Sequence, residues 1–207
     1  MLPIPLARPG ALTGLLVALV VLACGRDSDA RVDGMDAVER AEAASLEPIR
    51  EAPPFELETL NGETLTLASL DSVPLVLMNF WASWCGPCKI EIPDLMALHE
   101  TYGAKGFMVL GVTVNDLPRD SREFADEIGM SYPSVIGTPK MLEAYELSPW
   151  LPTSLLIRDG KIVKEWIGPR SREEFEYPVK VALGLVPAAE DLMRDMAEPQ
   201  AEAGDGR

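Results

Sequence analysis

From residue 55 onward the hydrophobic positions fall into two repeating patterns. Leu75–Trp81 and Phe107–Val114 are nearly continuous apolar runs, which is typical of strands covered on both faces of a sheet. Gly86–Tyr102 and Arg119–Ile128 have the length of helices, and each is followed by a glycine that can end a helix. Strands that alternate with helices predict one layered α/β domain.

Two dipeptides mark tight turns between short apolar runs. Asn61-Gly62 predicts a hairpin over residues 55–67, and Asp159-Gly160 predicts a second hairpin over residues 153–167. Both pairs suit the positive φ angles that two-residue hairpin loops require. The domain is therefore expected to begin with a β-hairpin and to end with a hairpin followed by a helix.

Capping residues place two further helices. Thr138 followed by Pro139 predicts the start of a short helix, because threonine caps a helix and proline fits its first position. Ser171 and Glu174 form a capping box that predicts the last helix. Pro178 lies inside that helix, where it lacks an N–H group and crowds the preceding turn, so we expect a break or kink there.

The N-terminus has the pattern of a targeting segment. Ala11–Ala23 is apolar but only thirteen residues long, which gives about 20 Å of helix against a hydrocarbon core of about 30 Å. It fits the apolar region of a signal peptide over residues 1–23. Val21–Cys24 resembles a bacterial lipoprotein cleavage site, which implies cleavage before Cys24 and lipid attachment to its sulfur. An uncleaved anchor and plain secretion are the alternatives, and all three place the remaining chain outside the cytoplasm.

Composition divides the rest of the chain. Residues 24–52 are acidic and contain few large apolar side chains, so they predict a flexible tether before a domain over residues 53–186. Residues 187–207 form an acidic tail. The 207 residues include 18 basic and 33 acidic side chains, a net charge of −15. This charge argues against nucleic-acid binding and provides no attraction to anionic lipid.

The most specific motif is Trp84-Cys85-Gly86-Pro87-Cys88, which follows the apolar strand ending at Trp81. With this motif the sequence resembles the thioredoxin superfamily, and more narrowly its TlpA-like and ResA-like membrane-anchored thiol–disulfide oxidoreductases. The resemblance extends over residues 53–184. It implies a thioredoxin-like fold with a central mixed β-sheet flanked by helices, an N-terminal β-hairpin, and a strand–helix element inserted within residues 107–137.

The spacing of the two cysteines suits dithiol–disulfide exchange. A strand delivers Cys85 to a helix N-terminus, where free N–H groups and the helix dipole favour a thiolate. There the thiol pKa can fall from about 8.5 to about 7, worth roughly 2 kcal/mol. Cys85 is thus the expected nucleophile, and Cys88, one turn inside the helix, the resolving thiol that closes a redox disulfide. Trp84, Gly86 and Pro87 are expected to contact the substrate; simple packing is the alternative for Trp84.

Glu91 lies three residues after Cys88, on the same face of the helix. The resemblance implies a glutamate near the cysteines that influences their titration. If buried, its carboxyl would have a raised pKa and could relay the proton of Cys88. The alternative is an exposed helix residue. Asn79 stands where thioredoxin has a buried acid, and an amide cannot titrate, which favours the role for Glu91.

Leu151-Pro152-Thr153 precedes an apolar strand and matches the cis-proline loop of the superfamily. The resemblance implies that this loop lies against the active disulfide and that its backbone pairs with an extended substrate. An ordinary proline at a strand start is the alternative. Pro149-Trp150 stands where the family commonly has a glycine, so the surroundings of the loop are expected to be unusual.

These features predict a cofactor-free reductant of protein disulfides. Gly-Pro between the cysteines is the thioredoxin dipeptide, which is associated with reduction potentials of about −270 mV, whereas a strong oxidant has a reduction potential of about −120 mV. That gap is roughly 7 kcal/mol and favours reduction. The resemblance implies a membrane thiol-transfer protein as electron donor, and substrates of the cytochrome c maturation or metal-centre assembly type. The chain is expected to act as a monomer.

Three alternatives use the same cysteines. A Cu(I) chaperone would hold copper between Cys85 and Cys88, because soft thiolates suit Cu(I). A scaffold would keep them as an inert disulfide. A peroxiredoxin-like antioxidant is disfavoured, because Met78 and Ala82 replace the proline and the threonine or serine expected before the reactive cysteine.

Two cofactor sites are disfavoured. Lys89 stands where c-type haem attachment needs histidine. A zinc site would need more ligands than the cysteine pair and His99, which is expected to be a surface helix residue. No metal site is therefore predicted.

Overall fold

A computed structural model describes the fold of residues 46–186. The expected signal peptide, Cys24 with its lipid, most of the tether and the acidic tail lie outside the described residues. Strands are β1 Arg50–Glu51, β2 Glu56–Glu58, β3 Thr64–Thr66, β4 Leu75–Trp81, β5 Phe107–Thr113, β6 Ser134–Ile136, β7 Thr153–Arg158 and β8 Lys161–Ile167. Helices are α2 Gly86–Tyr102, α3 Pro118–Ile128, α4 Pro139–Ala144 and α5 Arg172–Ala182, with short 3-10 turns at Ala68–Leu70 and Gly103–Lys105.

The centre of the fold is a six-stranded mixed sheet in the order β1-β8-β7-β4-β5-β6. β4 runs parallel to β5 and antiparallel to β7, so it is hydrogen-bonded on both sides. β2 and β3 form a separate hairpin. Helix α3 and strand β6 fall in the interval predicted for the inserted element. The predicted thioredoxin-like fold is confirmed.

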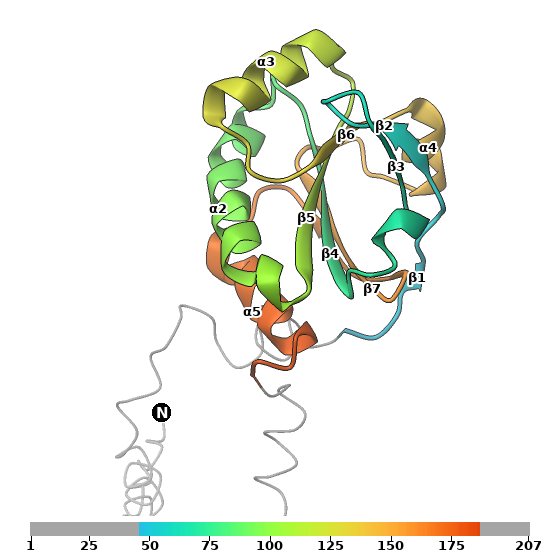
Figure 1. The fold of residues 1–207 in the computed structure, drawn as a ribbon, viewed down its shortest axis with the longest axis vertical. Coiled ribbons are helices and arrows are strands. Elements are labelled where there is room, and N and C mark those ends of the chain that lie inside the picture. The colour runs from blue at the N-terminus through green and yellow to red at the C-terminus, as the bar shows by residue number, and fades with distance from the viewer. Residues whose placement is uncertain (1–45, 187–207) are drawn as a thin grey trace, which may run out of the picture. The chain divides into compact units, whose positions relative to one another are not determined.

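Side chains of β4 alternate between two apolar layers. Leu75, Leu77 and Trp81 face the layer formed with α2, α3 and α5. Val76, Met78 and Phe80 face the layer formed with the hairpin and α4. Figure 1 shows α2 and α5 on one side of the sheet and the β2–β3 hairpin with α4 on the other. This double coverage explains why β4 reads as one continuous apolar run.

The N-terminal boundary of the domain differs from the prediction. Residues assigned to the end of the tether join the sheet, because Arg50 and Glu51 pair with Ile162 and Lys161 of β8. Leu46 is buried as well, and its carbonyl accepts a hydrogen bond from the Arg158 guanidinium at 3.0 Å. Because a two-residue edge strand is held by backbone hydrogen bonds, no pattern of side chains predicts it.

Helix α5 continues through Pro178, so the expected break is absent. Pro178 lies on the buried face of the helix, together with Phe175 and Val179. The helix is also fixed at its start by the predicted capping box of Ser171 and Glu174. Packing and capping therefore offset the one hydrogen bond that proline removes. Within residues 46–186, no helix has the length and apolar character needed to cross a membrane.

Candidate functional site

The two cysteines lie where the carboxyl end of β4 passes into α2. They form a disulfide with Cα atoms 5.3 Å apart, as expected for the redox pair. Cys85 is the N-cap of α2, and its sulfur accepts a hydrogen bond from the Cys88 backbone N–H at 3.2 Å. Pro87 occupies the first turn, where its missing N–H leaves nothing unpaired. The helix start thus supplies a donor directly to the Cys85 sulfur.

Both cysteines are buried in the disulfide-bonded state. Cys85 keeps 4% of its surface exposed and Cys88 keeps 1%. In the disulfide-bonded state both cysteines are therefore buried, and Cys85 is the more exposed of the two. Gly86 and Pro87, which are expected to contact the substrate, are exposed at the start of the helix.

Several exposed apolar residues belong to segments that lie at this end of the sheet. Trp84 is 61% exposed and Trp150 is 70% exposed. Ile90 on the first turns of α2, Leu117 after β5 and Ile167 at the end of β8 are exposed too. We call these five residues the apolar rim. They account for five of the seven large hydrophobic residues that are exposed within residues 46–186.

The cis-proline loop lies beside the end of β4. The Leu151–Pro152 peptide bond is cis, as predicted, and Thr153 pairs with Phe80 of β4. The Thr153 hydroxyl donates to the carbonyl of Trp150 at 2.8 Å, and the Pro152 carbonyl accepts from the N–H of Gly168 at 2.8 Å. Pro152 and Thr153 are buried, while Leu151 is half-buried. The loop is therefore fixed on both sides of Leu151.

Glu91 is buried, with 2% of its surface exposed, so the exposed alternative is wrong. The Asn79 amide donates to Glu91 Oε1 at 2.8 Å, and the Arg170 backbone N–H donates to Oε2 at 2.8 Å. Burial raises the pKa of Glu91 to about 7, although these two hydrogen bonds and the Arg170 charge oppose the rise, and Asp94 adds slightly to it. An acid with this pKa exchanges a proton near neutral pH.

Sequence reasoning missed the residues that hold Glu91. Asn79 is more than a non-titrating replacement, since its amide also donates to Ser154 Oγ at 2.9 Å and links β4, β7 and α2. Asn79 Oδ1 has no partner among the described residues. Ser154 lies two positions after the cis-proline, and Arg170 acts through its backbone. The pairing of β4 with β7 could have identified Ser154, because it places Ser154 opposite Asn79. Arg170 could not have been identified, because any residue except proline can supply a backbone N–H at that position.

His99, which was expected at the surface of the helix, is half-buried. Its Nδ1 atom accepts a hydrogen bond from the N–H of Val109 at 3.2 Å, and its ring contacts Tyr132 edge-on. Burial lowers its pKa. Within the described part of the chain, no three histidine, cysteine or acidic side chains come together as metal ligands would.

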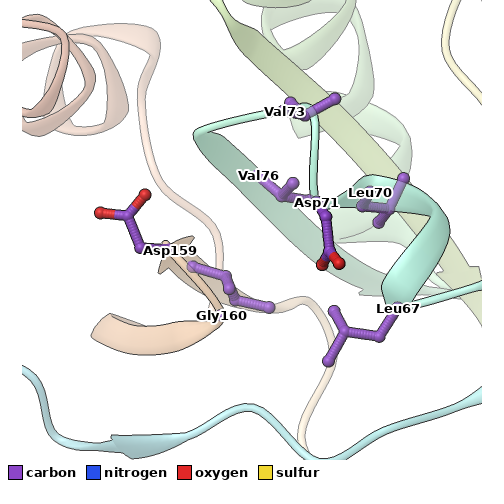
Figure 2. A pocket seen from close by; sticks show the side chains of 8 residues that line it. Leu67, Leu70, Asp71, Val73, Val76, Asp159 and Gly160 are labelled. Atoms are coloured by element: carbon purple, nitrogen blue, oxygen red, sulfur yellow. The ribbon is translucent and has the colours of Figure 1, made fainter.

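A cavity of about 310 Å³ lies at the opposite end of β4 from the disulfide. Val73 and Val76 at the start of the strand line it, together with the turn at Asp159 and Gly160. Figure 2 shows the carboxylate of Asp71 close to the side chains of Leu67, Leu70 and Val76, whereas that of Asp159 points away from them. No cysteine lines this cavity, and both cysteines of the disulfide lie at the other end of the strand.

Comparisons with known proteins agree with this site. The AhpC/TSA family matches residues 48–165. The thiol-disulfide oxidoreductase ResA of Bacillus thuringiensis (strain Al Hakam) is 33% identical over 133 residues, which cover 63% of this chain and 76% of that protein. ResA of Bacillus subtilis (strain 168) is 36% identical over 116 residues, 55% of this chain and 64% of that protein. A thiol:disulfide interchange protein from Chlorobium tepidum TLS has a similar structure, with a TM-score of 0.61, 33% identity, and coverage of 67% of this chain and 98% of that one.

Proposed function

Because the chain belongs to the AhpC/TSA family and is a ResA-like thiol–disulfide oxidoreductase of the thioredoxin superfamily, we propose that it reduces disulfides of protein substrates outside the cytoplasm. The observation that carries the proposal is the Cys85–Cys88 disulfide at the start of α2, at the end of the sheet to which the residues of the apolar rim belong. Gly86-Pro87 between the cysteines supports a reducing rather than an oxidising role.

The exchange begins with the dithiol form. The Cys85 thiolate attacks one sulfur of the substrate disulfide, and the other substrate sulfur leaves as a thiolate that takes up a proton. Cys88 then loses its proton and attacks Cys85 Sγ, which breaks the mixed disulfide and releases the second substrate sulfur. Two electrons pass from the protein to the substrate, and the Cys85–Cys88 disulfide remains to be reduced by a donor.

The helix start favours the first step. Because Cys85 is the N-cap, the Cys88 N–H that reaches its sulfur is one of the donors left without a partner inside the helix. A hydrogen bond from this group stabilises a thiolate more than a neutral thiol. Cys85 also remains the more exposed of the two sulfur-bearing residues, so it is the one that a substrate meets first.

Glu91 is proposed to serve the second step. It follows Cys88 by three residues, and both residues lie on the buried face of α2. Cys88 must lose a proton in a site that water scarcely reaches, and a carboxylate with a pKa of about 7 is matched to accept it. Asn79 and the Arg170 N–H hold the carboxylate in place for this transfer.

A polypeptide suits the surroundings of the disulfide better than a small thiol does. The apolar rim offers contact area on several sides, and exposed apolar patches commonly mark interaction sites. No backbone group within residues 46–186 hydrogen-bonds to the backbone of Leu151, so its N–H and C=O are available to an extended substrate strand. Pro152 and Thr153 would fix the register of that pairing.

We further propose the setting in which this exchange occurs. Residues 1–23 would act as a lipoprotein signal peptide, Cys24 as the lipid-bearing residue, and residues 24–52 and 187–207 as the tether and tail of the domain over 53–186. Because the chain would then face an oxidising compartment, it would need a membrane thiol-transfer protein as electron donor. Substrates of the cytochrome c maturation or metal-centre assembly type fit a reductant at this location.

Trapping tests the proposed function. Cys88→Ser removes the resolving thiol, so the mixed disulfide on Cys85 should accumulate and be released by dithiothreitol. The double variant Cys85→Ser/Cys88→Ser is the matched control, because it keeps Cys24 and loses only the nucleophile. Protein adducts on Cys88→Ser that are absent from the control would support the proposal. Equal adducts on both variants, or none on either in an extract rich in protein disulfides, would contradict it.

A further inference from the structure

The loop between β4 and α2 is held by residues that follow the neighbouring strand β5. Ala82–Trp84 has no regular secondary structure, yet it places the nucleophile and the first residue of the apolar rim. The Ser83 backbone N–H donates to Asp116 Oδ2 at 2.7 Å, and the Ser83 hydroxyl donates to Asp116 Oδ1 at 3.1 Å. The Trp84 indole N–H donates to the Asn115 carbonyl at 2.9 Å.

The backbone at Asn115 explains how two consecutive residues reach the loop together. Asn115 has a φ of 52°, a left-handed conformation that asparagine tolerates better than most residues. This turn ends the run of β5 and directs the Asn115 carbonyl and the Asp116 side chain toward the loop. Because β4 and β5 are parallel neighbours, their carboxyl ends lie at the same edge of the sheet.

Asp116 is itself held by the start of α3. The Leu117 N–H donates to Oδ1 at 3.0 Å and the Ser121 hydroxyl to Oδ2 at 2.9 Å. Ser121 is buried and shares a 2.7 Å hydrogen bond with Thr113 at the end of β5. Four donors thus converge on one carboxylate, which is an acceptor at both oxygens.

Two of these four donors are backbone N–H groups on different oxygens, and a backbone donor cannot reverse its role. An amide in place of the carboxylate would turn an N–H toward either Ser83 or Leu117 and leave one of them without an acceptor. The site therefore requires a carboxylate in particular, although Asp116 contacts neither sulfur.

From this arrangement we infer that Asp116 is a positioning residue for protein substrates: it fixes Ser83, and with Asn115 it fixes the Trp84 ring in the apolar rim beside Cys85. The inference rests on the proposed reduction of protein disulfides. The sulfur of Cys85 has its own support in the Cys88 N–H, so Asp116 matters for the surface that a polypeptide contacts and much less for the thiolate itself.

The test compares two substrates of different size. Asp116→Asn in the full chain should lower the rate constant for reduction of insulin disulfides by about tenfold, within the hundredfold that a 1 Å misplacement can cost. The reaction of the reduced protein with the small disulfide 5,5′-dithiobis(2-nitrobenzoate) should change by less than about twofold, since it needs the sulfur alone. Both rates are followed against pH, so that a change in thiol pKa is separated from a change in the plateau rate.

Asp120→Asn is the matched control, because Asp120 lies on the first turn of the same helix and pairs with Arg119 at the surface. It should leave both rates at wild-type values. Ser83→Ala removes the hydroxyl contact but keeps the N–H contact, and it should show the same separation of the two rates to a smaller extent. If urea unfolding shows that Asp116→Asn is not folded, the two rates of Ser83→Ala test the inference instead.

The outcomes separate the inference from its premise. Unchanged insulin reduction in Asp116→Asn, or a parallel fall of both rates, would overturn the role of Asp116 while the proposed function stands. A wild-type protein that reacts with the small disulfide but not with insulin would instead remove the proposed function, and the inference with it.

Discussion

Replacing Glu91 with glutamine isolates the consequence of burying an acid beside the cysteines. Burial raises the pKa of Glu91 from 4.5 to about 7, a difference worth roughly 3 kcal/mol. The folded protein therefore keeps a proton that the unfolded chain releases between these pH values. The contribution to stability is fully present below about pH 4.5 and is lost as the pH rises through 7.

Glutamine is a fair mimic of the protonated acid at this position. Its oxygen can accept from the Arg170 N–H, and its amide N–H can donate to Asn79 Oδ1 if the Asn79 amide turns over, since that oxygen has no other partner within residues 46–186. The variant should lack the pH-dependent contribution. Relative to Glu91→Gln, the wild-type protein should lose roughly 3 kcal/mol of unfolding free energy between pH 4.5 and pH 8.

Urea unfolding of the disulfide-bonded protein at several pH values measures this difference. Glu100→Gln is the matched control, because it removes one exposed carboxylate from the same helix. A wild-type to Glu91→Gln difference that stays constant with pH, within about 0.5 kcal/mol, would refute the raised pKa, and Glu91 would then be unsuited to accept the Cys88 proton.

Other predictions concern packing, capping and substrate contact. Gly111→Ala should destabilise the fold by about 1–3 kcal/mol in urea unfolding, because a Cβ there would lie 2.6 Å from Ser134 Oγ, whereas Gly103→Ala meets open space and should not destabilise it. Ser171→Ala should cost about 1 kcal/mol through loss of the capping box, with no change in the rate of disulfide exchange. Trp150→Ala should slow insulin reduction severalfold, on the order of 1 kcal/mol of contact energy, without changing the rate of reaction with a small disulfide. A variant that reduces insulin as fast as the wild type would show that the apolar rim does not contact the substrate.

The fold was predictable where one residue pattern determines one element. Leu75–Trp81 is apolar throughout because both faces of β4 are covered, and Ser171 with Glu174 announces the start of α5. The sequence failed where the cause is backbone pairing or packing. β1 has no side-chain signature, and Pro178 interrupts nothing because α5 is held from its start and along its buried face.

The candidate site shows the same division. Cys85, Cys88 and Pro152 are recognisable because each has a distinctive neighbour in sequence, and Glu91 because its spacing places it on the face of Cys88. Asn79 was read as a loss of an acid, although its amide positions Glu91. The carboxylate at Asp116 was missed for a geometrical reason: it follows β5, and only the parallel pairing of β4 with β5 brings it to the loop before Cys85.

The central claim is that the start of α2 turns Cys85 into an acidic, reachable thiol. Alkylation of the reduced, folded protein with iodoacetamide from pH 5 to pH 10, with mass spectrometry to assign the modified cysteine, tests it directly. We predict that Cys85 is alkylated before Cys88 and that its alkylation rate rises with pH, with a midpoint at about pH 7. A midpoint near about 8.5, the value of an ordinary thiol, or no reaction at Cys85 until the protein unfolds, would contradict the account.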